Sequence, residues 1–185
     1  MNAETGPTPR RIYIASLADY NAGRLLGAWI DVTDDPADIH AGISEVLASS
    51  PEPDAEEWAI HDYEGFGPWR LHEWQAPEQM ATAARGIDRH GMAFAYWLDY
   101  LSLELDPDAS DSELDETFTS DYLGEWDSLE DFARSLIADY GVTISVEPAR
   151  WQHYAHLDVE AMARDLAIDL YAAETPDNTV HVFDP

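Results

Sequence analysis

The residues of this chain with the greatest capacity for chemistry are its carboxylates. The sequence carries 38 Asp and Glu against nine basic residues, all of them Arg, and its formal net charge is −29. Acids are densest between Arg89 and Arg134, an interval that contains no Lys or Arg. Crowded carboxylates repel one another and weaken the compact state. A folded domain keeps such a cost only where it is offset or used, so this interval is the first candidate for function.

The catalytic and metal-binding motifs that these residue types could form are incomplete. His72-Glu73 lacks a second His at the zincin spacing, because position 76 is Ala. A calcium-like loop begins at Asp106, but its turn position is Asp111 and its twelfth position is Thr117, where Gly and Glu are required. Neither motif therefore predicts a metal site.

A third set, His153, His156 and Asp158, could be drawn as a metal site, but ordinary partly buried histidines explain it better. Carboxylate pairs occur throughout the chain, so none stands out as an acid/base couple. We expect a protein that is not an enzyme, with no catalytic residues, no metal and no cofactor. The alternative is a small hydrolase with a carboxylate site, which would show one or two acids of raised pKa in a pocket.

Composition limits the class of protein. The chain has 185 residues, no Cys and a hydrophobic share of 45%, which is enough for a packed core without disulfides. Neither a signal peptide nor a run of about 18 apolar residues is present, so we expect a cytoplasmic protein with no membrane partner. The acidic balance also argues against binding nucleic acid, since that requires a cationic surface. It favours a basic partner or none.

The charge itself has three explanations. Adaptation to salt and a GC-rich codon usage both enrich acids and deplete Lys. The third is imitation of the DNA backbone. Duplex DNA carries one charge per ~1.7 Å, so a charge of −29 corresponds to roughly 50 Å of duplex. That length is comparable with the expected diameter of a compact chain of this size, near 40 Å.

The sequence predicts both strands and helices to position these acids, which indicates an α+β fold. Residues 11–17 and 25–32 alternate as strands around a turn-rich loop at 19–23, and residues 57–63 form a third strand. Thr33-Asp34-Asp35-Pro36 begins a helix that ends before Ser50. Trp29, Trp58, Trp97 and Phe132 occupy periodic positions typical of a core.

Helices follow in the middle of the chain, and a second sheet ends it. We predict helices over 77–90, 92–103 and 111–118, then one from Ser128, whose capping box includes Asp131, and one capped by Asp158. Residues 168–173 and 179–183 read as a hairpin that pairs with 122–126. The prediction is an elongated chain with a mobile tail (1–10) and three small units in a row: an N-terminal α+β unit (11–73), an acidic helical unit (74–118) and a C-terminal α+β unit (119–185).

Several of these blocks resemble one family. IYIASLADYNAGRLLGAWID (residues 12–31), followed by EEWAIHDYEGFG (residues 56–67), is similar to the ArdA family of antirestriction proteins. YLGEWDS (122–128), ARDL (163–166) and the terminal HVF (181–183) extend the similarity. The resemblance covers residues 11–184. Members of this family are homodimers from mobile genetic elements that mimic bent B-form DNA and block the DNA-binding groove of type I restriction-modification enzymes.

The resemblance therefore implies a partner, the methyltransferase core of a type I enzyme, and a surface of carboxylates that replace phosphates. The alternative is an acidic module that sequesters other basic DNA-binding proteins. The expected pseudo-phosphates are Asp99, Glu104, Asp106, Asp108, Asp111, Glu113, Asp115, Glu116, Asp121, Glu125, Asp127, and in the first unit Asp34, Asp35, Asp38, Glu45, Glu52, Asp54, Glu56 and Glu57.

A homodimer requires a contact away from the densest acids, where two copies would repel. The C-terminal unit is the least repulsive place, since it carries several Arg and three aromatic residues without a clear core pattern. We therefore expect the dimer contact at Trp126, Trp151 and Tyr154.

Overall fold

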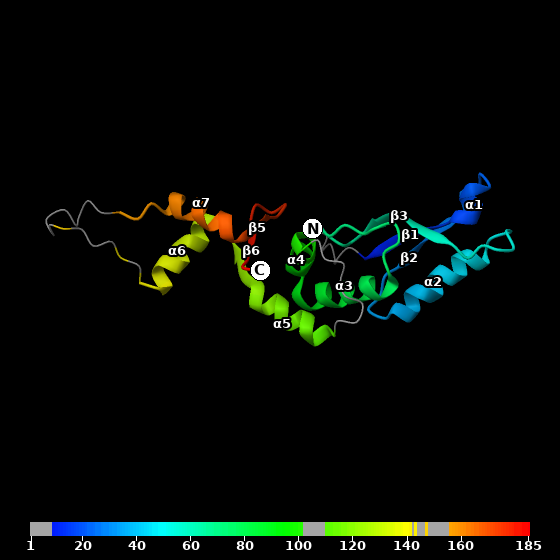
Figure 1. Cartoon of the computed structure of the whole chain (residues 1–185), viewed down its shortest axis with the longest axis horizontal. Coiled ribbons are helices and arrows are strands. Elements are labelled where there is room, and N and C mark those ends of the chain that lie inside the picture. The colour runs from blue at the N-terminus through cyan, green and yellow to red at the C-terminus, as the bar shows by residue number, and fades with distance from the viewer. Residues whose placement is uncertain (1–8, 102–109, 142, 144–146, 148–155) are drawn as a thin grey trace, which may run out of the picture. The chain divides into compact units, whose positions relative to one another are not determined.

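The computed structural model describes residues 9–101, 110–141, 143, 147 and 156–185. The chain is an α+β protein with two small antiparallel sheets (Figure 1). It divides into two compact units, Met1–Asp115 and Glu116–Pro185, and the boundary falls within helix α5. The predicted α+β class is confirmed. The finer division of the chain at residues 74 and 119 stays a prediction.

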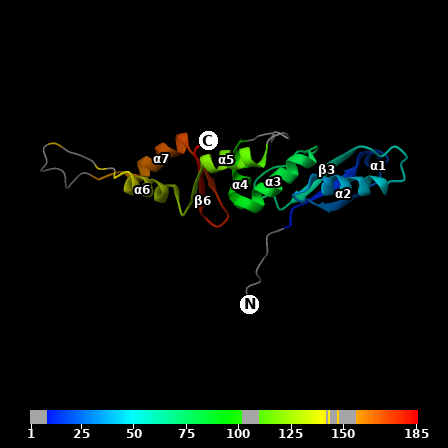
Figure 2. The ribbon, with the colours of Figure 1, turned by 90° about the horizontal axis from the view of Figure 1, so that it is seen from below.

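The N-terminal unit is built on a three-stranded antiparallel sheet. Its strands β1 (Arg11–Ser16), β2 (Gly27–Asp31) and β3 (Trp58–Glu64) lie in the order β2-β1-β3. Helix α2 (Pro36–Ala48) runs along the sheet, as Figure 2 shows from a second side. It buries Ile39, Ile43 and Val46. On the central strand the buried residues are Ile12, Ile14, Ala15 and Ser16. The predicted helix and strands of this region are confirmed within a few residues.

The segment between β1 and β2 differs from its prediction as a loop, because residues Leu17–Asn21 form a short helix, α1. Ser16 caps this helix by accepting a hydrogen bond from the Asp19 backbone N–H at 3.3 Å. The fully buried Asp19 carboxylate accepts from the Ser16 hydroxyl and from Nε of Arg24, each at 2.8 Å. The hydroxyl of Ser50 also donates to it, and this bond is the largest cause of the lowered pKa of Asp19. The buried charge is thus satisfied and joins two loops.

Two helices complete the N-terminal unit's core. Helix α3 (Pro77–His90) and helix α4 (Met92–Leu101) pack together through an Ala-rich face and the fully buried Phe94 and Trp97. A side chain on Gly86 would lie 2.2 Å from the Phe94 ring, so glycine permits this close approach. Gly91, with φ of 68°, ends α3 as predicted.

The C-terminal unit is also built on a small antiparallel sheet, and two helices lie between its first and second strands in the chain. Strands β4 (Tyr122–Trp126), β5 (Tyr171–Glu174) and β6 (Val180–Phe183) lie in the order β4-β6-β5. Helices α6 (Leu129–Asp139) and α7 (Val159–Asp169) pack with each other. Ser128 and Asp158 cap these helices as predicted. The predicted hairpin and its pairing with β4 are confirmed.

Helix α5 (Asp111–Asp121) ends in the core of the C-terminal unit. Its Phe118 is buried and stacks on Tyr122 with ring centroids 5.1 Å apart. Tyr122 and Tyr171 both contact Phe183, which is fully buried on the central strand. Aromatic contacts therefore hold the helix and all three strands of this unit together.

Two sequence-based expectations about apolar residues are wrong. Trp29 was expected in the core but is 40% exposed. It lies against Tyr13, with ring centroids 5.7 Å apart, and the Arg11 guanidinium lies 5.5 Å from its ring centre. Ile168 was expected at the start of a strand, but it belongs to the last turn of α7 and is 80% exposed. Within the residues described, no helix has both the length and the hydrophobicity that crossing a membrane requires.

Candidate functional site

The acids predicted for the N-terminal unit lie on α2 and on the loops that flank it. Asp38 and Glu45 stand seven residues apart on α2, so they share one face, and both are exposed. Asp35 caps the same helix by accepting from the Ala37 backbone N–H at 2.8 Å. Beyond the helix lie further exposed acids. The exposed acids of this group are Asp34, Asp35, Asp38, Glu45, Asp54, Glu56 and Glu57; Glu52, half-buried, pairs with Arg24.

Helix α5 carries acids on two faces. Asp111 and Asp115, one turn apart, pair with α3 of the same unit. Nε of Arg85 donates to Asp111 at 2.8 Å, and Nε2 of His90 lies 2.8 Å from Asp115, which also pairs with Arg89. The interval between Arg89 and Arg134 contains no Lys or Arg, so the cations that pair with these acids come from helix α3. These two carboxylates are engaged within the chain.

The opposite face of α5 carries Glu113 and Glu116, which are exposed. Glu113 accepts from the backbone N–H of Ser110 at 3.0 Å, and its own N–H donates to the Ser110 hydroxyl at 3.3 Å, which together form a capping box. Hydrogen bonds from the Ser110 side chain and backbone lower the pKa of Glu113. The pKa of Asp115 is lowered by Arg89 first and by His90 second. Both carboxylates are therefore ionised at neutral pH.

The remaining predicted acids are distributed over α4 and the C-terminal unit. Asp99 and Asp121 are half-buried, whereas Glu125 and Asp127 are exposed. The Thr179 hydroxyl donates to Glu125 at 2.6 Å. The predicted acids Glu104, Asp106 and Asp108 lie outside the described residues.

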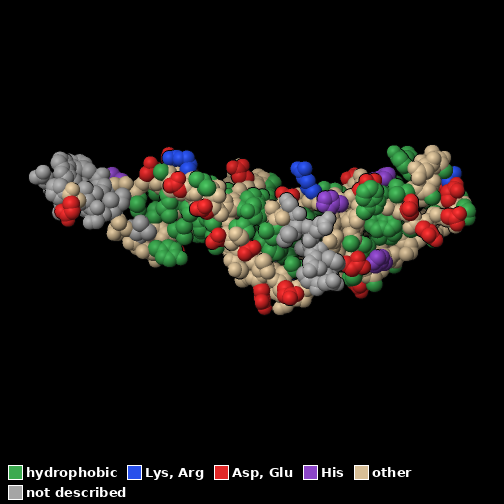
Figure 3. Space-filling view, in the orientation of Figure 1, with side chains coloured by type: hydrophobic (Ala, Val, Ile, Leu, Met, Phe, Trp, Pro, Cys, Tyr) green, Lys and Arg blue, Asp and Glu red, His purple; other side chains and the backbone are tan. Residues whose placement is uncertain are grey.

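In the part of the chain that the structure describes, few Arg side chains remain free to repel a cationic partner. Arginines that the structure describes are mostly paired with carboxylates inside the chain; these are Arg10, Arg11, Arg24, Arg85, Arg89 and Arg134. By contrast, several acids have side chains that form no hydrogen bond or salt bridge with any described residue; these are Asp34, Glu45, Asp54, Glu56, Glu57, Asp99, Glu116 and Asp127. Figure 3 shows carboxylates along the displayed face with only isolated basic groups between them.

A comparison with models of protein families identifies the family of this acidic chain. The family model described as "Antirestriction protein (ArdA)" matches residues 12–180, which includes parts of both compact units. The chain belongs to the ArdA family. A comparison with curated proteins gives no match. ArdA proteins are inhibitors of restriction rather than enzymes, and they interact with restriction-modification enzymes.

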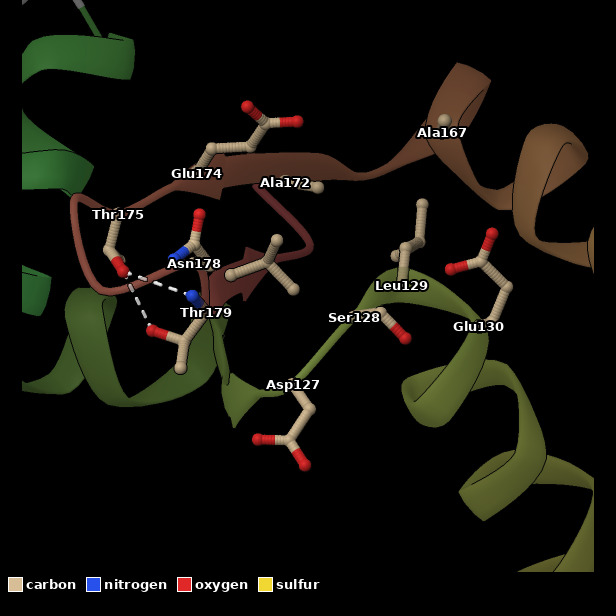
Figure 4. A pocket seen from close by; sticks show the side chains of 11 residues that line it. Asp127, Ser128, Leu129, Glu130, Ala167, Ala172, Glu174, Thr175, Asn178 and Thr179 are labelled. Atoms are coloured by element: carbon tan, nitrogen blue, oxygen red, sulfur yellow. Dashed lines mark hydrogen bonds between the residues drawn. The ribbon is translucent and has the colours of Figure 1, made fainter.

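A pocket in the C-terminal unit is lined by several polar side chains of this ArdA chain. Its volume is about 520 Å³, and Figure 4 shows the residues that line it. The carboxylates of Asp127, Glu130 and Glu174 point to different sides of the pocket. The hydroxyls of Thr175 and Thr179 lie 2.8 Å apart and contact each other. This arrangement does not aim two acids at a common point, as acid–base hydrolysis requires.

No group of three or more His, Asp or Glu among the described residues could hold a metal ion. Asp158 accepts from the Ala161 N–H at 2.9 Å as the predicted cap of α7. Its proposed companion His153 lies outside the described residues.

Of the predicted dimer contacts in this ArdA protein, the structure describes Trp126. Its indole is half-buried, donates to the Leu123 carbonyl at 3.2 Å and contacts Phe132 with ring centroids 5.5 Å apart. Much of this ring is therefore used within its own unit. Trp151 and Tyr154 lie outside the described residues.

Sequence reasoning missed the pairing between α3 and α5 and the exposed Trp74. The pairing leaves a signal that could have been used. Arg85 and Arg89 are four residues apart, as are Asp111 and Asp115, so each pair lines one helix face with matching spacing. Trp74 carries no such signal, because it follows the third strand in a segment without regular periodicity.

Proposed function

We propose that this ArdA protein inhibits restriction by occupying the DNA-binding groove of a type I restriction-modification enzyme as a mimic of bent B-form DNA. The observation that carries the proposal is the set of exposed acids without internal partners, beside arginines that are mostly consumed in internal salt bridges. Such a surface attracts the cationic groove that binds DNA and repels nucleic acid itself.

The spacing of these acids supports imitation of phosphates. Side chains three or four residues apart on a helix have Cβ atoms about 5–6 Å apart. Successive phosphates of one DNA strand rise 3.4 Å along the axis and also wind around it. The separation of neighbouring phosphates is therefore similar to that of two such side chains on a helix. Glu113 and Glu116 are placed in this way on α5. A mimic of this kind offers no base edges, so it acts on enzymes of different sequence specificity.

The proposal includes a homodimer joined through the C-terminal unit. A type I enzyme reads a two-part site, and two copies related by a two-fold axis would match its pseudo-symmetry. The large apolar side chains exposed in this unit support such a contact, since burying them in a partner is favourable; they are Tyr140, Leu157 and Ile168.

The decisive experiment is a competition titration. A purified type I methyltransferase core is bound to labelled cognate duplex at low salt, and the protein is added in increasing amounts. We expect stoichiometric displacement of the duplex, with an end point of two chains per core. A duplex that stays bound at a large excess of the protein contradicts the proposal. Equal binding to an unrelated basic DNA-binding protein would instead favour general sequestration of such proteins.

A further inference from the structure

Two indole rings and two carboxylates line a hollow beside strand β3 in the N-terminal unit. The hollow has a volume of about 480 Å³ and is lined by Leu17, Glu56, Glu57, Trp58 and Trp74. Trp74 is 67% exposed, which is unusual for so large an apolar side chain, whereas Trp58 is half-buried. Both glutamates are exposed and form no salt bridge with a described Arg or His.

The backbone around this hollow is fixed by hydrogen bonds. The Leu17 N–H donates to the Glu57 carbonyl at 3.0 Å, and Trp58 pairs in register with Ser16 on β1. The segment before Trp74 is held to the sheet, because the Ile60 N–H donates to the Glu73 carbonyl at 2.8 Å. Gln75, which is buried, accepts from the backbone N–H of His72 and closes the turn that carries Trp74. The rings are therefore presented by ordered backbone, which reduces the entropy lost on binding.

Elsewhere in the same unit, an indole ring and a glutamate together bind an arginine side chain. On the exposed side of the same sheet, the Arg11 guanidinium lies 5.5 Å from the centre of the Trp29 ring. The same guanidinium donates through Nε to Glu64 at 2.8 Å. Arginine suits this setting because its planar group stacks on aromatic faces and binds carboxylates with several donors. The hollow offers the same residue types, with a second indole and a second carboxylate, but no arginine of the described chain enters it.

We propose that this hollow takes an arginine side chain from the cationic groove of the inhibited enzyme. The guanidinium lies against the indole of Trp74 and pairs with Glu56 or Glu57, while its methylene stem contacts Leu17 and Trp58. The inference rests on the proposed function for the identity of the partner, but not for the chemistry of the hollow. It predicts one local contact that supplies a large share of the binding free energy, because Trp and Arg residues dominate the energetics of interfaces. Most exposed acids of the surface contribute little to the binding free energy individually.

The first test compares variants in the competition titration at several salt concentrations. Trp74→Ala should weaken binding by about tenfold or more at every salt concentration, because a buried indole contact is lost. The dependence of affinity on salt should stay that of the unmodified protein, since no charge has changed. Glu56→Gln/Glu57→Gln should weaken binding and also reduce the salt dependence. Combining all three changes should cost less than the sum of the separate effects, since the residues hold the same guanidinium.

The matched control is Trp29→Ala, which removes an exposed indole of the same sheet whose cation is already supplied by Arg11. Leu25→Ala, at an 89% exposed position, is a second control. Both should bind within about twofold of the unmodified protein, with folding checked by circular dichroism. A Trp74→Ala protein that binds as well as these controls overturns the inference, even where the unmodified protein displaces DNA.

A second test does not depend on the restriction enzyme. Oligoarginine and oligolysine of equal length are added to the isolated protein while the indole N–H resonance of Trp74, assigned through Trp74→Phe, is followed by NMR. Oligoarginine should shift this resonance more than oligolysine does, and Glu56→Gln/Glu57→Gln should reduce the shift. An unmoved Trp74 resonance overturns the inference. A shift together with failure to displace DNA would overturn the proposed function alone.

Discussion

At the scale of the residue, His181 shows how a buried titratable group couples the fold to pH. Its side chain is 7% exposed on the central strand β6, with Nδ1 at 2.9 Å from the Tyr122 hydroxyl. Burial lowers the pKa of His181 below the ordinary value of 6.5, and the facing Glu125 opposes this shift in part. The folded unit therefore favours the neutral ring, whereas the unfolded chain takes up a proton near pH 6.5.

The sign of the effect follows from these two states. Stability is complete above the unfolded pKa and falls as the pH drops through 6.5 towards the lower folded pKa. We expect the free energy of unfolding of the C-terminal unit, from urea titrations, to be lower at pH 5.5 than at pH 7.5. His181→Gln should reduce this loss, whereas His61→Gln, at an exposed position, should not. A His181 ring whose NMR titration midpoint lies above 6.5 contradicts the assignment.

At the scale of the element, strands and helices follow the sequence closely where local signals agree. The helix at Pro77–His90 has its predicted bounds because Pro begins it and Gly91 ends it. The sequence does not predict helix α1, because its capping residues, Ser16 and Asp19, fit the end of a strand and the start of a loop equally well. Likewise, periodicity placed Trp29 in a core, but it cannot tell which face of a three-stranded sheet is covered.

The candidate surface was predictable as a set of acids but not as an arrangement. A run of carboxylates specifies charge, whereas the pairing of each acid depends on a helix distant in sequence. For α5 this pairing separates Asp111 and Asp115, which face Arg85 and Arg89, from Glu113 and Glu116, which face solvent. The two faces should therefore respond differently to the same loss of charge.

We expect Asp111→Asn/Asp115→Asn to lower the melting temperature, because Arg85, Arg89 and His90 lose the carboxylates that they pair with, and to change binding little. Glu113→Gln/Glu116→Gln should instead weaken inhibition by roughly tenfold, given that each exposed pair contributes modestly. It should leave the melting temperature unchanged or raised, since Gln can keep the capping hydrogen bonds with Ser110. Each variant removes two charges and so controls for the other. Equal losses of binding would contradict the division of α5 into two faces.

At the scale of the whole molecule, the net charge of −29 acts on folding and on binding in opposite directions. Repulsion among the unpaired acids weakens the folded chain, while the same acids attract a cationic partner. The internal salt bridges lower the repulsion locally, at α3 and α5 for example, but several acids in the described part of the chain take no part in them.

Salt tests that balance without any mutation. Ions screen exposed charges, and the screening length falls from about 10 Å at 0.1 M to about 3 Å at 1 M. We expect the melting temperature to rise between 50 and 500 mM NaCl, because net repulsion is weakened more than the internal pairs. Over the same range, the affinity for a type I methyltransferase core should fall by at least about tenfold, as it does for DNA. A melting temperature that falls with salt would mean that the internal pairs dominate folding. An affinity that does not change would mean that apolar contacts such as Trp74, rather than the carboxylates, carry the interaction.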